Sequence, residues 1–217
     1  MAVSINKYGK AYANLLGGES SGDTFAVDFL SDTLKMALAG SGYTPDLDAH
    51  EVFSDVTSEV TGTGYTAGGA TLGSKTITYT AANSWATARA NSTAYVVGDI
   101  VRPAAGNGHL YRCIVAGTSH SSAPTFPTVS GQTVAEGSGT VVWAEIGRGL
   151  TQLDAADPSW TSATISGIRY AVIYKSTGTG STSPLLWLID FGADQAVTSG
   201  TFTAVFAALG IETFSTP

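Results

Sequence analysis

The segment IRYAVIYKSTGTGSTSPLLWLIDF, residues Ile168–Phe191, decides how the rest of this chain can fold. Its two ends, Ile168–Lys175 and Leu185–Phe191, are runs of β-branched, aromatic and aliphatic residues, and the nine residues between them are small, polar or turn-forming. This pattern predicts a β-hairpin with a long tip. The second run is apolar on both faces for most of its length, which is typical of a central strand. We therefore expect the rest of the fold to pack around this hairpin.

The first run of the hairpin alternates in character, because side chains along a strand point to opposite faces with a period of two. One face carries Ile168, Tyr170, Val172 and Tyr174. The other face carries Arg169, Ala171, Ile173 and Lys175. We expect one of these two faces to be buried.

Composition narrows the class of protein. The chain has 217 residues, 43% of them hydrophobic, which is enough for one large or two modest domains with real cores. Only 12% of the residues are charged, against a usual ~25%. Low charge with many Gly and Thr residues is typical of all-β extracellular or virion-coat proteins. The net charge of −7 argues against a grip on phosphate backbones, so we expect no nucleic-acid partner.

Cysteine content and the terminal segments add further expectations. Cys113 is the single cysteine, so it cannot form an intrachain disulfide, and we expect it to be a small buried hydrophobe. No run approaches the ~18 apolar residues that span a membrane, and the N-terminus lacks a signal-peptide core, so membrane insertion is not expected. Residues 1–22 read as an extended arm that either lies on a neighbouring subunit or forms a simple tail. The apolar end of the chain, LGIETFSTP, predicts cover by a neighbouring surface.

The remaining segments outside the centre of the chain predict a β-sandwich-like core domain. Strand-like alternation occurs in Phe25–Phe29, Leu34–Ala39, Lys75–Ala81 and, as a last strand, Gly200–Ala208. The segment Asp48–Val60 has apolar residues at helical spacing behind a start that resembles a capping box, and it predicts the one short helix.

The centre of the chain differs in character from its flanks. Residues 92–147 hold three of the seven prolines, two of the three histidines and the cysteine. Three short strands are expected here, in 93–103, 108–117 and 140–147, joined by turn-rich stretches. We predict an inserted small three-stranded β-module at 90–149, which divides the core domain into residues 23–89 and 150–217. Anchoring both ends in a larger domain lowers the cost of holding so small a core folded.

Searches for catalytic or metal chemistry give weak candidates only. The cluster Asp46, Asp48, His50 and Glu51 offers hard-metal ligands but lacks a Gly-turned calcium loop, so helix capping is the favoured interpretation over metal binding. The glycine-rich segment 62–73 lacks the strand and helix context of a phosphate loop. Asp154 and Asp157 could be nominated as a carboxylate pair, but Asp157 before Pro158 reads more simply as a turn. We expect no enzymatic activity, no metal and no cofactor.

The module resembles a known kind of domain. The order Tyr95, Gly98-Asp99, Val101, Gly108, Leu110-Tyr111, Pro124 and Trp143 is similar to that of the small carbohydrate-binding modules of chitinases and cellulases, and of related modules in phage tail and coat proteins. The resemblance implies a sheet that displays aromatic rings for stacking on sugars. The paired tryptophans usual on the sugar face are missing here. The candidate glycan contacts are Tyr95, Tyr111, Phe126 and Trp143. A core role for these aromatics is the alternative.

The rest of the chain resembles a family of tailed-bacteriophage virion proteins, over residues 31–69, 154–175 and 184–203. The resemblance implies a capsid decoration or minor head protein on the outside of the virion, assembled in the host cytoplasm and released by lysis. The implied partners are the major capsid protein and further copies of the chain, as a trimer by analogy, with host-surface or environmental glycans as a further partner. A tail-associated glycan or receptor binder and a tail or neck subunit are the alternatives.

Overall fold

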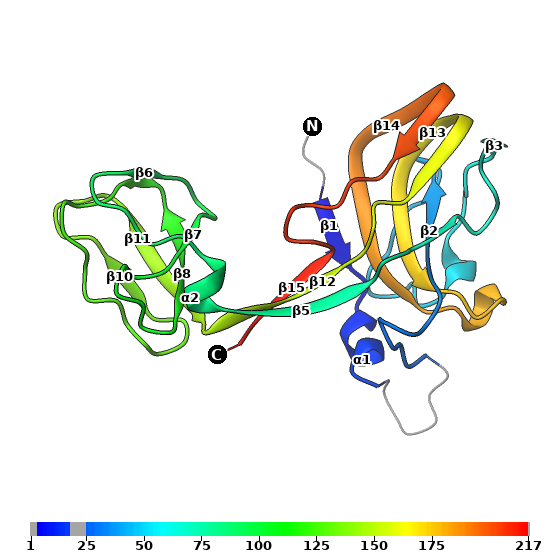
Figure 1. The fold of residues 1–217 in the computed structure, drawn as a ribbon. Helices are drawn as coiled ribbons and strands as arrows, with labels where there is room; N and C mark the ends of the chain where they lie inside the picture. Colours follow the sequence, from blue (N-terminus) through cyan, green and yellow to red (C-terminus); the bar gives the residue numbers. More distant parts are fainter. Residues whose placement is uncertain (1–3, 18–24, 217) are drawn as a thin grey trace. The chain divides into compact units, whose positions relative to one another are not determined.

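The computed structural model describes residues 4–17 and 25–216 (Figure 1). The chain is an all-β protein with several antiparallel sheets, as predicted. It divides into two compact units. The first unit comprises Met1–Thr76 and Asp154–Ile211, and the second comprises Ile77–Leu153 and Glu212–Pro217. No helix among the described residues is both long and apolar enough to cross a membrane.

The first unit is built on one antiparallel sheet centred on the predicted hairpin. Its strands, in spatial order, are β1 (Ser4–Lys7), β14 (Leu185–Thr203), β13 (Ser159–Lys175), β2 (Leu34–Ala39) and β4 (Ala70–Thr71), and β3 (Gly62–Thr63) also pairs with β13. The hairpin prediction is confirmed, since Tyr170 pairs with Asp190 and Tyr174 with Leu185. A short 3-10 turn, η2 (Gly180–Thr182), lies in its tip.

Both faces of the hairpin are buried, whereas the alternation of the first run predicted one. On one face Val172 and Tyr174 join a cluster with Tyr8 and Tyr43, and Phe53 stacks on Tyr174 at 4.1 Å between ring centroids. On the other face Ala171 and Ile173 are fully buried, and Phe29 meets Trp187 edge-on at 6.2 Å. The central strand prediction for the second run is therefore confirmed.

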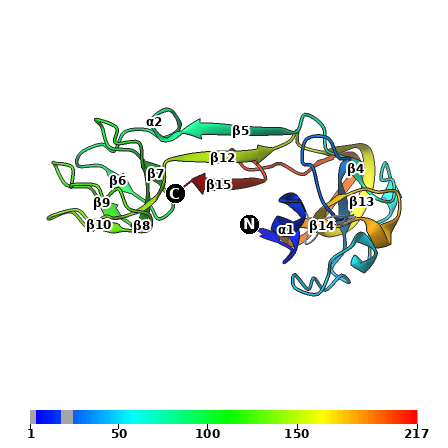
Figure 2. The same cartoon turned by 90° about the horizontal axis from the view of Figure 1, so that it is seen from below.

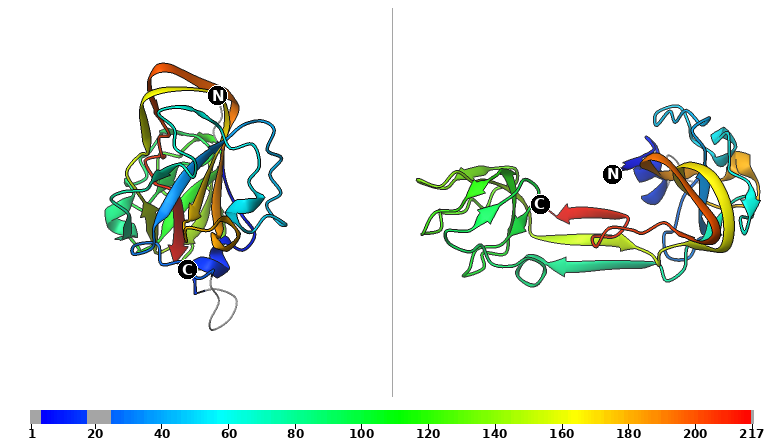
Figure 3. Two further views of the ribbon diagram at one scale, coloured as in Figure 1. Left: turned by 90° about the vertical axis from the view of Figure 1, so that its right-hand side faces the viewer. Right: turned by 90° about the horizontal axis from the view of Figure 1, so that it is seen from above.

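The two long strands curve together because their ladder is interrupted (Figure 3). Ser162 and Gly167 on β13, and Gly192 and Ser199 on β14, have positive φ angles between 50° and 76°. Such residues form bulges, which bend a strand and increase its twist. The separate last strand predicted at Gly200–Ala208 is wrong, because β14 runs on to Thr203 and a different strand ends the chain.

The helix predicted at Asp48–Val60 is wrong, since only the 3-10 turn η1 (Phe53–Asp55) forms there. The Asp55 carboxylate accepts the backbone N–H groups of Glu51 and Val52 at 2.9 and 3.0 Å, which holds a tight turn instead of a longer helix. Packing of Phe53 on Tyr174 then outweighs the helical spacing of the apolar residues. The α-helices of the described residues are the short α1 (Ala11–Leu15) and α2 (Ala82–Trp85).

Two predictions near the N-terminus are also corrected. Within the arm predicted at 1–22, residues 1–3 and 18–22 lie outside the described residues, while β1 and α1 belong to the first unit because β1 pairs with β14 along its length. The segment Phe25–Phe29 is not a strand. The Asp28 carboxylate accepts the N–H groups of Leu30 and Ser31 and makes a turn, which places Phe29 in the core.

The second unit contains three small sheets. A three-stranded sheet orders β15 (Glu212–Thr216), β12 (Gly149–Asp154) and β5 (Thr76–Ala81), which lie side by side in Figure 2. A four-stranded sheet orders β10 (Thr133–Ala135), β11 (Val142–Gly147), β8 (Leu110–Val115) and β7 (Ile100–Val101). The strands β6 (Ala94–Tyr95) and β9 (Gly117–Thr118) form a two-stranded ladder.

The expected three strands of the module are present, but β10 adds a fourth to their sheet. The predicted limits at 90 and 149 both lie inside the second unit. The unit extends further because β5 and β12, which enter and leave the module, share a sheet with β15. The apolar tail of the chain is covered in part by this pairing, since Glu212–Thr216 lie opposite Leu153–Gly149.

Candidate ligand site in the second unit

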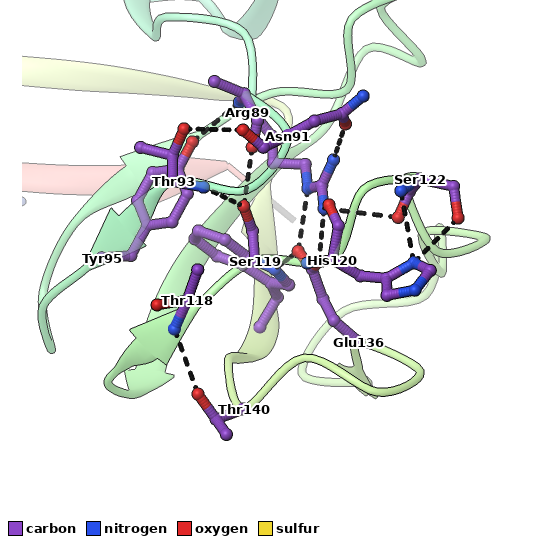
Figure 4. A network of polar contacts seen from close by, with 12 residues as sticks. Arg89, Asn91, Thr93, Tyr95, Thr118, Ser119, His120, Ser122, Glu136 and Thr140 are labelled. Atoms are coloured by element: carbon purple, nitrogen blue, oxygen red, sulfur yellow. Dashed lines mark hydrogen bonds and ion pairs between the residues drawn. The ribbon is translucent and has the colours of Figure 1, made fainter.

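The most elaborate polar arrangement of the second unit surrounds a buried ion pair (Figure 4). Arg89 is 4% exposed and Glu136 is 1% exposed. The Arg89 Nε donates to Glu136 Oε1 at 2.9 Å, and its Nη2 donates to Glu136 Oε2, which makes a bidentate pair. The His120 N–H also donates to Oε2, at 2.7 Å. Every oxygen of the buried carboxylate therefore accepts hydrogen bonds.

The ion pair is tied to the hydrophobic core beneath it. Trp143 Nε1 donates to Glu136 Oε1 at 2.6 Å, and the ring of Trp143 meets Tyr95 in a T-shaped contact at 4.9 Å. The Tyr95 hydroxyl accepts the N–H of Ala90 at 2.7 Å, beside Arg89. The hydrogen-bond partners of the pair are thus fixed by packed aromatic rings, which rigidifies the whole arrangement.

The charge of Glu136 is stabilised within this network. Burial alone would raise the pKa of its carboxyl group, but hydrogen bonds from Arg89, Trp143 and the His120 N–H outweigh burial and hold the pKa below its ordinary value. Arg89 also donates to the carbonyl oxygens of His120 and Ser122. The pair therefore anchors the 120–122 turn from below.

Above this anchor lies a shallow pocket of about 390 Å³. Its lining consists of small polar residues, namely Ser92, Thr118, Ser119, His120, Ser121, Ser138, Gly139 and Thr140. Thr140 Oγ1 accepts the N–H of Thr118 at 3.0 Å, and Ser119 Oγ donates to the carbonyl of Ala90 at 2.8 Å, so part of the rim is fixed by its own hydrogen bonds (Figure 4). A lining of this kind suits a neutral, hydroxyl-rich ligand held by hydrogen bonds.

His120 supplies the single imidazole of this lining. Its Nδ1 accepts the backbone N–H of Ser122 at 3.2 Å and lies 2.9 Å from the Ser122 hydroxyl. Because a backbone N–H can only donate, the neutral ring carries its proton on Nε2. His120 therefore adds a fixed donor to a set of hydroxyl groups that can donate or accept.

The four aromatic residues proposed for sugar stacking are not displayed on a surface. Tyr111 and Trp143 are fully buried, Phe126 is 9% exposed and Tyr95 is half-buried, and all four belong to one core cluster. Tyr111 and Phe126 lie 4.4 Å apart, and the Tyr111 hydroxyl donates to the carbonyl of Pro127. Burial of Tyr111, Phe126 and Trp143 counts against the stacking role for these three residues and favours the alternative that they are core residues.

The acidic candidates of the first unit are occupied by local contacts. Asp46 Oδ1 accepts the N–H groups of Asp48 and Ala49, both at 3.0 Å. Within the described ranges, no three His, Cys, Asp or Glu side chains gather as metal ligands. The Asp157 carboxylate accepts the N–H of Phe206 at 2.8 Å, while Asp154 accepts the N–H of Ala155. These two carboxylates therefore order backbone turns.

A second buried pair lies elsewhere in the same unit. His109 Nδ1 is 2.8 Å from Glu145 Oε1, which also accepts the N–H of Gly147 at 2.7 Å. Both side chains are at least 93% buried. Glu145 Oε2 has no hydrogen-bond partner among the described residues. This pair lies beside Tyr111, whose pKa is raised, by burial first.

Sequence reasoning missed Arg89 and Glu136, which are separated by 47 positions. Neither residue belongs to a recognisable motif, and the local sequence around each of them does not predict that they form an ion pair. The one available signal is the scarcity of charge, because residues 77–153 carry four arginines, two glutamates and one aspartate, so each charged side chain has few possible partners. Ser92, Ser119 and His120 carry no such signal.

Comparisons of the chain with models of known protein families, with curated protein sequences and with solved structures found no match.

Proposed function

We propose that this chain is a virion structural protein of a tailed bacteriophage, and that it decorates the outer face of the capsid shell. The first unit would bind the major capsid protein and sister copies by surface complementarity. The second unit would be displayed outward from the shell. Assembly would take place in the host cytoplasm.

The observation that carries the proposal is that the two sequence resemblances fall on different units. The segments similar to phage virion proteins, 31–69, 154–175 and 184–203, all lie within the first unit. The residues similar to small binding modules, from Tyr95 to Trp143, all lie within the second. The chain leaves the first unit after Thr76, returns to it at Asp154 and enters the second unit again at Glu212, so most of the second unit lies between two segments of the first. A scaffold with an inserted module is the organisation expected of a display protein.

Immunogold labelling of intact particles tests this proposal. An epitope tag would be inserted between Ala104 and Ala105, two exposed residues of the turn between β7 and β8, in the full-length chain. We expect gold over the head of purified phage particles. Gold confined to the tail would refute decoration and favour the tail alternative, and particles that lack the protein altogether would refute a virion role.

A second candidate function, glycan or receptor binding, is favoured by the hydroxyl-lined pocket described above. Ser138 lies exposed on its rim, so a Ser138→Tyr substitution would fill the pocket without touching the buried ion pair. Ser130→Tyr, at another exposed position of the same unit, is the matched control. The full chain and both variants would be applied to a glycan array. Binding that Ser138→Tyr abolishes and Ser130→Tyr preserves would support this function, and the absence of any binding would refute it.

A further inference from the structure

The outer edge of β5 is open. In the three-stranded sheet β12 is central and β5 lies at one side, and among the described residues no strand pairs with its outer edge (Figure 2). Five of its six residues are exposed, and the sixth is half-exposed. Ile77 is 47% exposed and Tyr79 is 57% exposed, so β5 also presents two large apolar side chains to solvent.

The hydrogen bond at the end of β5 defines which backbone groups face outward. The N–H of Ala82 donates to the carbonyl of Arg148, just before β12 begins. Backbone groups alternate in direction along an antiparallel strand, so those of Thr78 and Thr80 face β12, whereas those of Ile77 and Tyr79 face the open edge. The same register places Tyr79 over Gly149, where an added Cβ would lie 2.6 Å from the Tyr79 hydroxyl oxygen.

This edge lacks the features that usually protect an outer strand. Natural edge strands avoid further pairing by carrying Lys, Pro, inward-pointing charges or bulges. The sequence of β5 is TITYTA, which contains no charged residue and no proline. The neighbouring Lys75 does not protect it, because its ammonium group donates to the carbonyl of Asp32 in the first unit. An exposed, uncharged, β-branched edge of this kind is a template for another strand.

We propose that β5 pairs antiparallel with β5 of a second copy of this chain, about a two-fold axis through Thr78. In this register Ile77 of each copy lies opposite Tyr79 of the other, and their outward backbone groups form a hydrogen-bonded pair. Ile77 and Tyr79 lie on the same face of the strand, so both exposed apolar side chains gain a cross-strand partner. The two three-stranded sheets become one continuous six-stranded sheet.

A second copy is the occupant that fits this edge best. The partner strand must be extended, and every second residue must have backbone N–H and C=O groups free to pair. It must also place no like charges opposite each other across the new contact. β5 itself meets all three conditions, because it is an uncharged edge strand with the same pattern. The contact is isologous, so it joins copies in pairs, whereas the trimer expected by analogy would need a heterologous contact. The inference does not depend on the virion proposal.

Cysteine cross-linking of the full chain tests the register. Thr78 of one copy lies opposite Thr78 of the other in a non-hydrogen-bonded pair, with Cα atoms about 4.5 Å apart, within disulfide range. We expect Thr78→Cys to form a covalent dimer on mild oxidation. Thr80→Cys, on the same face of the same strand, is the matched control, because its copies would be roughly 14 Å apart at the ~3.4 Å rise per strand residue. Cys113 is fully buried and leaves the native thiol out of the reaction.

The cross-linking outcomes separate specific pairing from collision. A dimer from Thr78→Cys that forms at least ten times faster than one from Thr80→Cys supports the proposal. Equal rates for the two variants, or no dimer from Thr78→Cys, would overturn it.

Light scattering after size exclusion tests the role of the backbone edge. Ile77→Pro removes an N–H that faces away from β12, so the ladder within the chain is kept while pairing with a second copy is blocked. We expect a dimer for the wild type and for Ile77→Val, and a monomer with unchanged far-ultraviolet circular dichroism for Ile77→Pro. A wild-type chain that stays monomeric at the highest soluble concentration, or a proline variant that stays dimeric, would overturn the inference.

Discussion

Replacement of Arg89 by Met should destabilise the second unit strongly, because it leaves the Glu136 carboxylate buried without its counter-charge. Glu136 would keep the hydrogen bonds from Trp143 Nε1 and the His120 N–H but lose the bidentate guanidinium. Removing one partner of a buried pair costs about 3–5 kcal/mol. The unit holds residues 77–153 and 212–217. At roughly 0.1 kcal/mol per residue its total stability is about 8 kcal/mol, so close to half would be lost.

Native-state hydrogen exchange of the full-length chain measures this loss unit by unit. Backbone amides of β11 should exchange at least about 100-fold faster in Arg89→Met than in the wild type. Each ~1.4 kcal/mol of lost stability raises the exchange rate by a factor of ten. Peptides from β13, in the first unit, serve as the internal control and should not change. The double variant Arg89→Met, Glu136→Gln removes the stranded charge as well. The free energy of unfolding of the second unit should be at least ~1 kcal/mol higher in the double variant than in Arg89→Met.

The lowered pKa of Glu136 also predicts the direction in which the stability of the second unit changes with pH. The folded-state pKa of Glu136 lies below its ordinary value of 4.5, so the folded state binds fewer protons than the unfolded state as pH falls. The stability contributed by Glu136 is therefore fully present above that value and is lost as pH drops through the lower, folded pKa. In Glu136→Gln this acid-dependent loss should shrink. An Arg89→Met cost below about 1 kcal/mol, or a double variant no more stable than the single one, would refute the assignment of a buried, charge-dependent anchor.

Three further predictions follow from particular contacts. Gly69→Ala should lower the free energy of unfolding of the first unit by more than about 2 kcal/mol in a urea titration. Gly69 has φ +73°, and an added Cβ would lie 1.8 Å from the Met36 carbonyl oxygen. Gly73→Ala is the control, because nothing lies within 4 Å of a Cβ added there. Trp143→Ala should cost about 3–5 kcal/mol of second-unit stability by hydrogen exchange, since the residue is fully buried, and an unchanged exchange rate would contradict its core role. Cys113 should react with a thiol reagent only after unfolding, because burial raises the pKa of its thiol and hides the sulfur, and rapid labelling of the native chain would contradict this.

The predictions that held from sequence rest on local patterns with a single physical meaning. Two runs rich in β-branched, aromatic and aliphatic residues, Ile168–Lys175 and Leu185–Phe191, with a turn-rich stretch between them, predict a hairpin from local sequence, and the structure contains it. The helix at Asp48–Val60 failed because several apolar residues at helical spacing also suit a loop whose backbone N–H groups are bound by Asp55. Local patterns of this kind do not reveal which competing hydrogen bond will form.

Local sequence patterns did not predict the candidate ligand site. Its anchor joins Arg89 to Glu136 across 47 positions, and its pocket is lined by serines and threonines that are common throughout the chain. The aromatic residues nominated for sugar binding were found by type, yet an aromatic residue in a strand is equally suited to a core or to a surface platform. Burial of Tyr111 and Trp143 favours the core role for these two residues.

The sequence by itself determined the all-β class, the central hairpin and the strands of the module, because alternation and turn chemistry act between near neighbours. Tertiary structure alone decided that Arg89 meets Glu136, that β12 lies between β15 and β5, and that no strand of residues 4–17 and 25–216 pairs with the outer edge of β5. These features depend on which distant segments come together, and that choice is made by the burial of whole faces and the pairing of buried charges across the fold.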